Sequence, residues 1–190
     1  MNTDDREIKH LMDRRQLVSI FRKPIDPGFG MQGFIVSFSK RYLLFHYVHK
    51  FFVDGLLLVN RSHIRDIVCD HAHLFQRQLL ESEGAIDGIN FEASYPVSSL
   101  PDFLNSLPPD EIVILEEEAI DEPTWNIGRF VDITPGGNVR IHGFSANGVW
   151  DDDLLAIDVA RVSCCQIQTN YIGLYTRYFK TQTIPAKPAG

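Results

Sequence analysis

The residue pattern of this chain repeats once, and this repeat constrains the fold more than any other feature of the sequence. At an offset of 95 residues, apolar residues meet apolar residues and Gly33 meets Gly128. The offset narrows to 93 where Asp54-Gly55 matches Asn147-Gly148, which a small length change in one hairpin explains. We interpret the chain as two copies of one unit. The other matched pairs are Val18/Val113, Ile20/Leu115, Ile25/Ile120, Asp26/Asp121, Val36/Val131, Phe38/Ile133, Ile64/Val159, Ile67/Val162 and Cys69/Cys164.

Each copy predicts a short helix followed by five strands. The first helix has an acid-rich start and a basic end, the charge order that suits the helix dipole. Apolar alternation and polar connections then indicate the strands. For the first copy we expect a helix at 3–16 and strands at 17–22, 32–39, 42–49, 51–59 and 63–68.

The second copy follows the same order. Ser98 or Ser99 caps its predicted helix, and the turn Thr134–Asn138 is the strongest hairpin signal in the chain. The run Asp151–Asp153 interrupts a strand as a bulge or a kink. We expect a helix at 98–107 and strands at 111–117, 125–134, 138–144, 148–157 and 159–166. After the fifth strands, segment 71–80 is expected to be helical and segment 171–180 to be a strand or a short helix.

Each copy of the repeat resembles the Sm/LSm-like small barrels, a group within the SH3-like barrels, in the positions of its glycines and loop residues. The resemblance rests on Gly33 and Gly128 inside the second strands, on the pairs 54–55 and 147–148 before the fourth, and on the closing segments 64–67 and 159–162. Glycine inside a strand lets a small sheet bend sharply. The resemblance implies a mainly β chain with short helices, built as two tandem five-stranded antiparallel barrels, each preceded by a short helix.

The domain organisation follows from the repeat. We expect a first helix and barrel at 1–80, an exposed linker at 81–97, a second helix and acidic barrel at 98–182, and a flexible tail at 183–190. The two barrels are expected to pack as an intrachain pseudo-dimer in place of the edge pairing of separate Sm-like chains, and further oligomerisation is compatible with this arrangement.

The sequence departs from the RNA-binding members of that family. Those members resemble one another in an Asp-x-Phe/Met-x-Asn element after the hairpin of the second strand, and neither 44–47 nor 139–142 of this chain contains that asparagine. They also share an Arg-Gly or Lys-Gly near the fourth and fifth strands, whereas the predicted fifth strands of this chain have Arg65-Asp66 and Arg161-Val162. The resemblance therefore supports a fold and does not carry over an RNA pocket.

Charge is distributed unevenly between the copies. Residues 1–95 carry 12 acidic and 12 basic side chains, whereas residues 96–190 carry 13 acidic and 6 basic ones and so hold the whole net charge of -7. An acidic surface repels phosphate backbones and attracts basic partners. We expect a non-enzymatic module that binds a protein with a basic surface. The predicted contact residues are Glu116, Glu117, Glu118, Asp151, Asp152 and Asp153.

Two alternatives remain open. Basic residues interleaved with aromatic ones in the loops of the first copy suit RNA or another single-stranded nucleic acid. These residues are Arg22, Lys23, Lys40, Arg41, Lys50, Arg61, Phe29 and Tyr42. The stretch Cys69-Asp70-His71-Ala72-His73 has ligand types that zinc accepts, which would suit a metal-dependent hydrolase. Because Cys69 matches Cys164, which no histidines follow, a small apolar wall residue is the simpler interpretation, and we expect no metal and no cofactor.

Other signals for catalysis and location are weak. His46 and His49 have no nucleophile in a recognisable motif beside them. Of the vicinal pair Cys164-Cys165, strand alternation predicts one thiol inside and one outside. No apolar stretch approaches the roughly 20 residues of a membrane span. With three cysteines and an acidic start that lacks a signal-peptide layout, we expect a cytoplasmic protein that does not contact a membrane.

Overall fold

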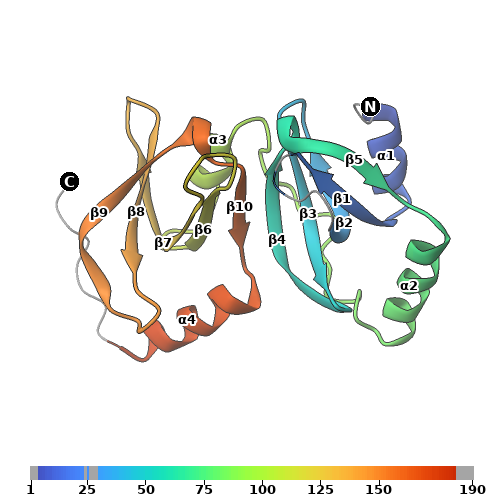
Figure 1. The fold of residues 1–190 in the computed structure, drawn as a ribbon. Helices are drawn as coiled ribbons and strands as arrows, with labels where there is room; N and C mark the ends of the chain where they lie inside the picture. The colour runs from blue at the N-terminus through green and yellow to red at the C-terminus, as the bar shows by residue number, and fades with distance from the viewer. Residues whose placement is uncertain (1–3, 24, 26–29, 183–190) are drawn as a thin grey trace. The chain divides into compact units, whose positions relative to one another are not determined.

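Ten strands and a few short helices form the part of the chain that the computed structural model describes, residues 4–23, 25 and 30–182. The chain divides into Met1–Ser98, called unit 1, and Ser99–Gly190, called unit 2. Every strand pairing described within either unit is antiparallel. The prediction of a mainly β chain with short helices is therefore confirmed (Figure 1).

Unit 1 has a five-stranded sheet in the order β5-β1-β2-β3-β4. Helix α1 begins after Asp4, whose side chain accepts a hydrogen bond from the Arg6 amide, and it lies against β2. Helix α2 lies against β1. The elements are α1 Asp5–Asp13, β1 Leu17–Arg22, β2 Met31–Phe38, β3 Tyr42–His49, β4 Phe52–Asn60, the 3₁₀ turn η1 Arg61–His63, β5 Ile64–Val68 and α2 His71–Ser82.

Unit 2 has the same strand order, β10-β6-β7-β8-β9. Ser99 caps its first helix, as predicted, by accepting from the Asp102 amide. Helix α3 contacts β7, and α4 contacts β6. The elements are α3 Leu100–Asn105, β6 Ile112–Glu117, β7 Thr124–Ile133, β8 Asn138–Phe144, β9 Trp150–Asp158, the 3₁₀ turn η2 Val159–Arg161, β10 Cys164–Ile167 and α4 Asn170–Lys180.

Three expectations need correction or refinement. The predicted strand 159–166 starts later than expected. The Asp158 side chain accepts from the Ala160 amide, so Val159–Arg161 form η2, and the strand that follows is β10. Segment 171–180 is helix α4, capped by Thr169. The expected two-barrel arrangement is not confirmed, since among the described strands the sheet of each unit is open, with β4 and β5, or β9 and β10, at opposite ends of its order. The predicted tail 183–190 lies outside the described residues.

Repeat-related positions distort the two sheets in the same way. Gly33 on β2 and Gly128 on β7 lie so close to the next strand that a Cβ would collide with the carbonyl oxygens of His46 and His142, respectively. Three residues later along each strand, at Val36 and Val131, the register shifts by one residue. A bulge at this place bends the strand.

Each core combines sheet residues with the helix that follows the fifth strand. In unit 1 a cluster that includes Phe34 also contains Leu80 of α2, and in unit 2 a cluster that includes Phe144 also contains Phe179 of α4. The expectation of an exposed linker is wrong at its apolar residues. Phe91 packs edge-on against Phe34 at 5.7 Å between centroids, and Ile89 is buried, because they complete the apolar cover of unit 1.

Candidate functional site: an aromatic and acidic pocket in unit 2

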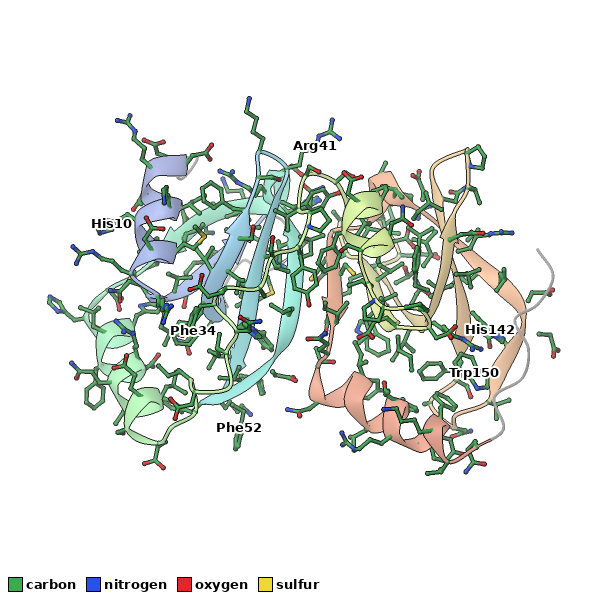
Figure 2. All side chains as sticks on the ribbon, turned by 180° about the vertical axis from the view of Figure 1, so that it is seen from behind. His10, Phe34, Arg41, Phe52, His142 and Trp150 are labelled. Atoms are coloured by element: carbon green, nitrogen blue, oxygen red, sulfur yellow. The ribbon has the colours of Figure 1, made fainter. Side chains whose placement is uncertain are left out.

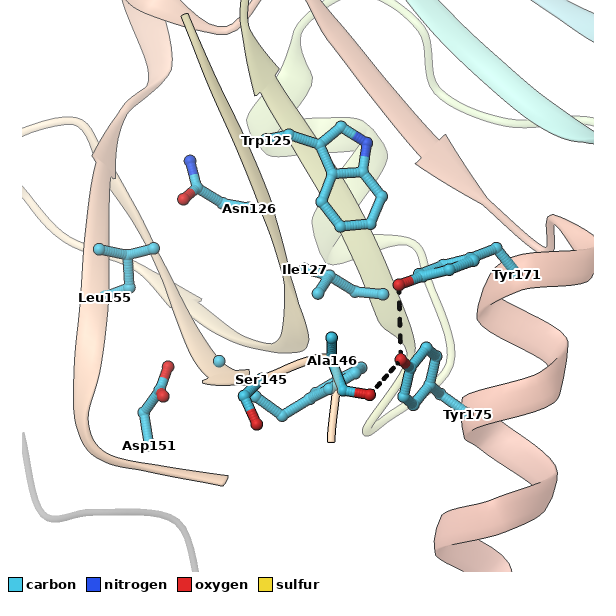
Figure 3. Close-up of a pocket in the computed structure, with 11 residues that line it drawn as sticks. Trp125, Asn126, Ile127, Ser145, Ala146, Asp151, Leu155, Tyr171 and Tyr175 are labelled. Carbon is cyan, nitrogen blue, oxygen red and sulfur yellow. Dashed lines mark hydrogen bonds between the residues drawn. The ribbon is translucent and has the colours of Figure 1, made fainter. Parts of the chain in front are cut away.

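A pocket of about 280 Å³ lies within unit 2, among β7, the end of β8, β9 and α4 (Figure 3). Its lining combines rings with polar groups, and all of it comes from unit 2. A pocket of this size lies just below the range of about 300–1,000 Å³ that is usual for ligand sites. The lining residues are Trp125, Asn126, Ile127, Gly143, Phe144, Ser145, Ala146, Asp151, Leu155, Tyr171 and Tyr175.

Three rings form one wall of this pocket. Trp125 on β7 meets Tyr171 edge-on, with 5.4 Å between ring centroids, and Tyr171 meets Tyr175 at 5.1 Å. The tyrosines share one face of α4 because they are four residues apart. The Tyr175 hydroxyl donates to the Ala146 carbonyl oxygen at 2.9 Å, which ties α4 to the β8–β9 loop (Figure 3). The wall is therefore held in place before any ligand arrives.

The tyrosine hydroxyls also contact each other. They lie 3.4 Å apart, and this hydrogen bond is the main reason why the pKa of Tyr171 is raised above its usual value. Burial adds to the same shift. The hydroxyl of Tyr171 therefore stays protonated at physiological pH, and its aromatic ring carries no negative charge.

A carboxylate forms the opposite side of the pocket. Asp151 lies on β9, across from the tyrosines of α4 (Figure 3). Its Oδ2 lies directly against Gly143, where a Cβ would collide with it. The register between β8 and β9 shifts here, as the interruption at Asp151–Asp153 predicted. Glycine at position 143 thus makes room for the carboxylate.

His142 fixes the backbone beneath this carboxylate. The side chain is buried and lies beside Trp150, with 4.8 Å between ring centroids (Figure 2). Its Nε2 lies 2.9 Å from the Asp151 carbonyl oxygen, and its Nδ1 lies 3.4 Å from an Arg129 nitrogen. A carbonyl oxygen can only accept a hydrogen bond, and a guanidinium can only donate one. The Nε2–H of His142 therefore donates to Asp151, and its Nδ1 accepts from Arg129. The bulge that carries Asp151 is therefore anchored to β8.

The aromatic surface continues along α4. A neighbouring hollow of about 370 Å³ shares Ala146, Tyr171 and Tyr175 with the pocket and adds Leu174 and Tyr178. Leu174 is 60% exposed and Tyr178 47% exposed. On its α4 side the pocket is therefore bordered by a wider aromatic and apolar face.

The two predicted acidic runs have different surroundings. Glu117 is buried, accepts from Thr124 Oγ1 at 2.7 Å and pairs with Arg161 at 2.9 Å. Glu118 accepts from Ser163 Oγ at 2.7 Å, and Glu116 accepts from the Gln166 side chain. By contrast, Asp151, Asp152 and Asp153 are exposed, and no ion pair within the described ranges engages their carboxylates.

The predicted nucleic-acid residues are brought together only in part. Arg22 and Tyr42 are buried. Arg61 pairs with Asp5 at 2.8 Å and also donates to the Ser39 carbonyl oxygen. Phe29 lies outside the described residues.

The exposed members of that set are Lys23, Lys40, Arg41 and Lys50. Lys40 and Arg41 precede β3, whereas Lys50 follows it, so they lie at opposite ends of one eight-residue strand. That strand spans about 25 Å at the usual rise per residue. Lys40 and Arg41 therefore lie far from Lys50. Arg61 and Lys23 lie nearer to the pair, because the Arg61 amide donates to the Arg41 carbonyl oxygen and the Lys23 amide donates to the His63 carbonyl oxygen in η1.

The histidine and cysteine candidates have structural roles. Cys69, His71 and His73 do not share an extended segment as expected, because α2 begins at His71, capped by Asp70. His73 Nδ1 lies 2.7 Å from Asp70 Oδ1, and its Nε2 lies 2.8 Å from Ser19 Oγ. Within the described ranges, no group of three or more His, Cys, Asp or Glu side chains could hold a metal ion.

Of the remaining catalytic and redox candidates, His46 is partly buried, Cys164 and Cys165 are buried, and His49 is exposed. Burial lowers the pKa of His46, whose Nδ1 donates to the Gly55 carbonyl oxygen at 3.1 Å. The exposed His49 contacts the Tyr47 hydroxyl. Cys164 and Cys165 are both buried, so the prediction of one outward thiol is wrong, and burial raises the pKa of Cys165 far above its usual value. The two buried thiols are therefore poorly suited to act as nucleophiles.

Comparisons of the chain with protein-family models, with curated proteins and with solved structures give no match. No helix in the described part of the chain is long and apolar enough to cross a membrane.

Sequence reasoning singled out Asp151 but missed the aromatic residues of the pocket. Trp125, Tyr171 and Tyr175 come from segments more than 40 residues apart and belong to no motif. The available signals were the tyrosine-rich stretch 171–178 and the unusual run Asp151–Asp153. These two segments come together only because 171–180 is the helix α4, whereas the sequence allowed a strand or a helix there.

Proposed function

We propose that this chain is a non-enzymatic interaction protein of two Sm-like modules, whose acidic unit 2 binds a protein with a basic surface. The Sm-like assignment draws its support from features that both units share. Each has a short helix before five strands in one order, with a 3₁₀ turn between the fourth and fifth strands. We also propose a cytoplasmic location, for which the odd number of cysteines is the support.

The observation that carries this proposal is the exposed run Asp151–Asp153 beside the aromatic pocket. β9 stands at one end of the strand order, and its three carboxylates have no ion-pair partner among the described residues. Internal partners hold Glu116–Glu118, so we assign the contact to the aspartates. Unpaired charges at an interface rim steer a partner of opposite sign and contribute to affinity.

A binding measurement tests the proposal. Isothermal titration of a nona-arginine peptide into the full chain should detect binding that weakens as salt is added. The triple variant D151N/D152N/D153N should bind about tenfold more weakly at low salt, because three rim charges together contribute roughly 1–2 kcal/mol.

The matched control is D121N/E122Q, which removes exposed charges from the β6–β7 loop of the same unit. It should change the affinity by less than about threefold. Equal binding by the native chain and the triple variant, or no binding at all, would refute the proposed contact.

A second candidate function is binding of single-stranded nucleic acid by unit 1. The exposed pair Lys40-Arg41 on the β2–β3 hairpin is the observation that favours it. A nine-nucleotide oligouridine should then bind in a salt-dependent way and lose affinity in K40Q/R41Q. Absence of binding at low salt would exclude this candidate.

A further inference from the structure

The pocket of unit 2 combines two features that recognise the same kind of group. Its wall of Trp125, Tyr171 and Tyr175 presents aromatic rings, whose faces attract cations. Asp151, on the opposite side, supplies a carboxylate (Figure 3). A phosphate or another anion would be repelled by that carboxylate, whereas a cation gains from both sides of the pocket.

We propose that this pocket binds one arginine or lysine side chain of the partner protein. The inference rests on the proposed function, since it locates the place where a basic partner is recognised. A single side chain is a suitable occupant for about 280 Å³, which is small for an independent ligand. The apolar stem would lie along Ile127 and Leu155, which also line the pocket, while its charged end meets Asp151.

The pocket is formed in advance of binding. The hydrogen bond from Tyr175 to Ala146 fixes one tyrosine, and the edge-on contact with Trp125 orients the other. A Cβ added at position 143 would collide with the carboxylate of Asp151. Asp151 therefore keeps its position only because residue 143 is a glycine. A preformed site loses little conformational entropy on binding, which favours a specific contact over a diffuse charge attraction.

The charge of the surroundings suits this occupant. Unit 2 carries the net negative charge of the chain. On β9, Asp152 and Asp153 directly follow Asp151, which lines the pocket. Neither of these two aspartates lines the pocket. They would attract a basic segment toward unit 2, and the pocket would then select one of its side chains.

Single substitutions in the full chain, titrated with nona-arginine and nona-lysine peptides, test the inference. Asp151→Asn should lower the affinity about tenfold, whereas Asp152→Asn, with the same charge change outside the pocket, should lower it less than threefold. Trp125→Leu should also lose about tenfold, and Trp125→Phe should keep most of the affinity because it retains an aromatic face.

The outcomes separate the two proposals. If D151N and D152N weaken binding equally and Trp125→Leu binds like the native chain, the attraction is diffuse: the proposed function stands and the pocket inference is wrong. If D151N/D152N/D153N also binds like the native chain, both are wrong. Binding of oligouridine at this pocket, lost in Trp125→Leu, would also overturn the inference. The isosteric D151N keeps the test valid should Trp125→Leu fail to fold.

Discussion

Units 1 and 2 share a framework and differ in what they place on it. In both, a glycine on the second strand packs against the third strand at a histidine, and that histidine hydrogen-bonds to a carbonyl oxygen of the fourth strand. The next residue differs. It is Gly143 in unit 2, where Asp151 occupies the space above it, and Tyr47 in unit 1. The residue whose carbonyl accepts from the histidine differs as well, being Asp151 in unit 2 and Gly55 in unit 1. Two differences therefore place a carboxylate there in unit 2 and not in unit 1.

The helices after the fifth strands show the same relation. Helix α2 buries His73 and Leu80, and α4 buries Ile172 and Phe179, so the buried residues are seven positions apart in both. Aligning these pairs places Ala72 and Gln76 of α2 where α4 has Tyr171 and Tyr175. The framework is therefore general, and the pocket depends on a few side chains that only unit 2 carries.

The largest expected effect comes from the shared framework. Gly33→Ala and Gly128→Ala should each destabilise the chain by about 3 kcal/mol, because the added Cβ collides with a backbone carbonyl that cannot move freely. Urea unfolding would measure the loss. Gly88→Ala is the control, since a Cβ there meets no atom within 4 Å. Similar stability of all three variants would contradict the shared packing.

A smaller effect tests the difference between the units. Gly143→Ala should displace the Asp151 carboxylate and weaken nona-arginine binding about fivefold, roughly 1 kcal/mol. The Gly136→Ala variant lies in the β7–β8 turn, where an added Cβ makes only ordinary van der Waals contacts, and should leave this affinity unchanged. Titration of both variants would show whether the glycine matters for the pocket, and equal affinities would argue against it.

The smallest effect concerns pH and unit 1. Burial holds the pKa of His46 below the unfolded value of 6.5, so the folded chain favours the neutral ring and the unfolded chain binds the proton more readily. This contribution to stability is present above about pH 6.5 and is lost as the pH falls below it.

His46→Gln removes that titration and keeps a side-chain amide that can donate to the Gly55 carbonyl oxygen. The urea midpoint of the variant should therefore fall less than that of the native chain between about pH 7.5 and pH 5.5. Equal falls in the two proteins would show that His46 does not contribute.

Much of the fold could be predicted from the residues, and the limits have physical causes. Strands 17–22, 42–49 and 138–144 agree with β1, β3 and β8, because apolar alternation and turn residues mark both of their ends. Segment 171–180 was ambiguous, since tyrosine suits strands as well as helices, and the Thr169 cap and the spacing of Ile172 and Phe179 decide for a helix.

The site was harder to predict than the fold. The two acidic runs behave differently in space although they look alike in sequence: Glu117 is buried against Arg161, whereas Asp151 lies beside aromatic rings. Long-range neighbours determine which carboxylates are left exposed, and a local pattern does not contain them. The openness of each sheet is likewise a property of long-range pairing.

Backbone chemical shifts of the isotope-labelled full chain, followed by NMR during titration with nona-arginine, test the central claim most directly. We expect the largest shifts at Trp125, at Asp151 and along 171–175, with small or no shifts in unit 1. Shifts concentrated in unit 1, or spread evenly over the acidic residues of unit 2, would contradict a pocket that selects one basic side chain.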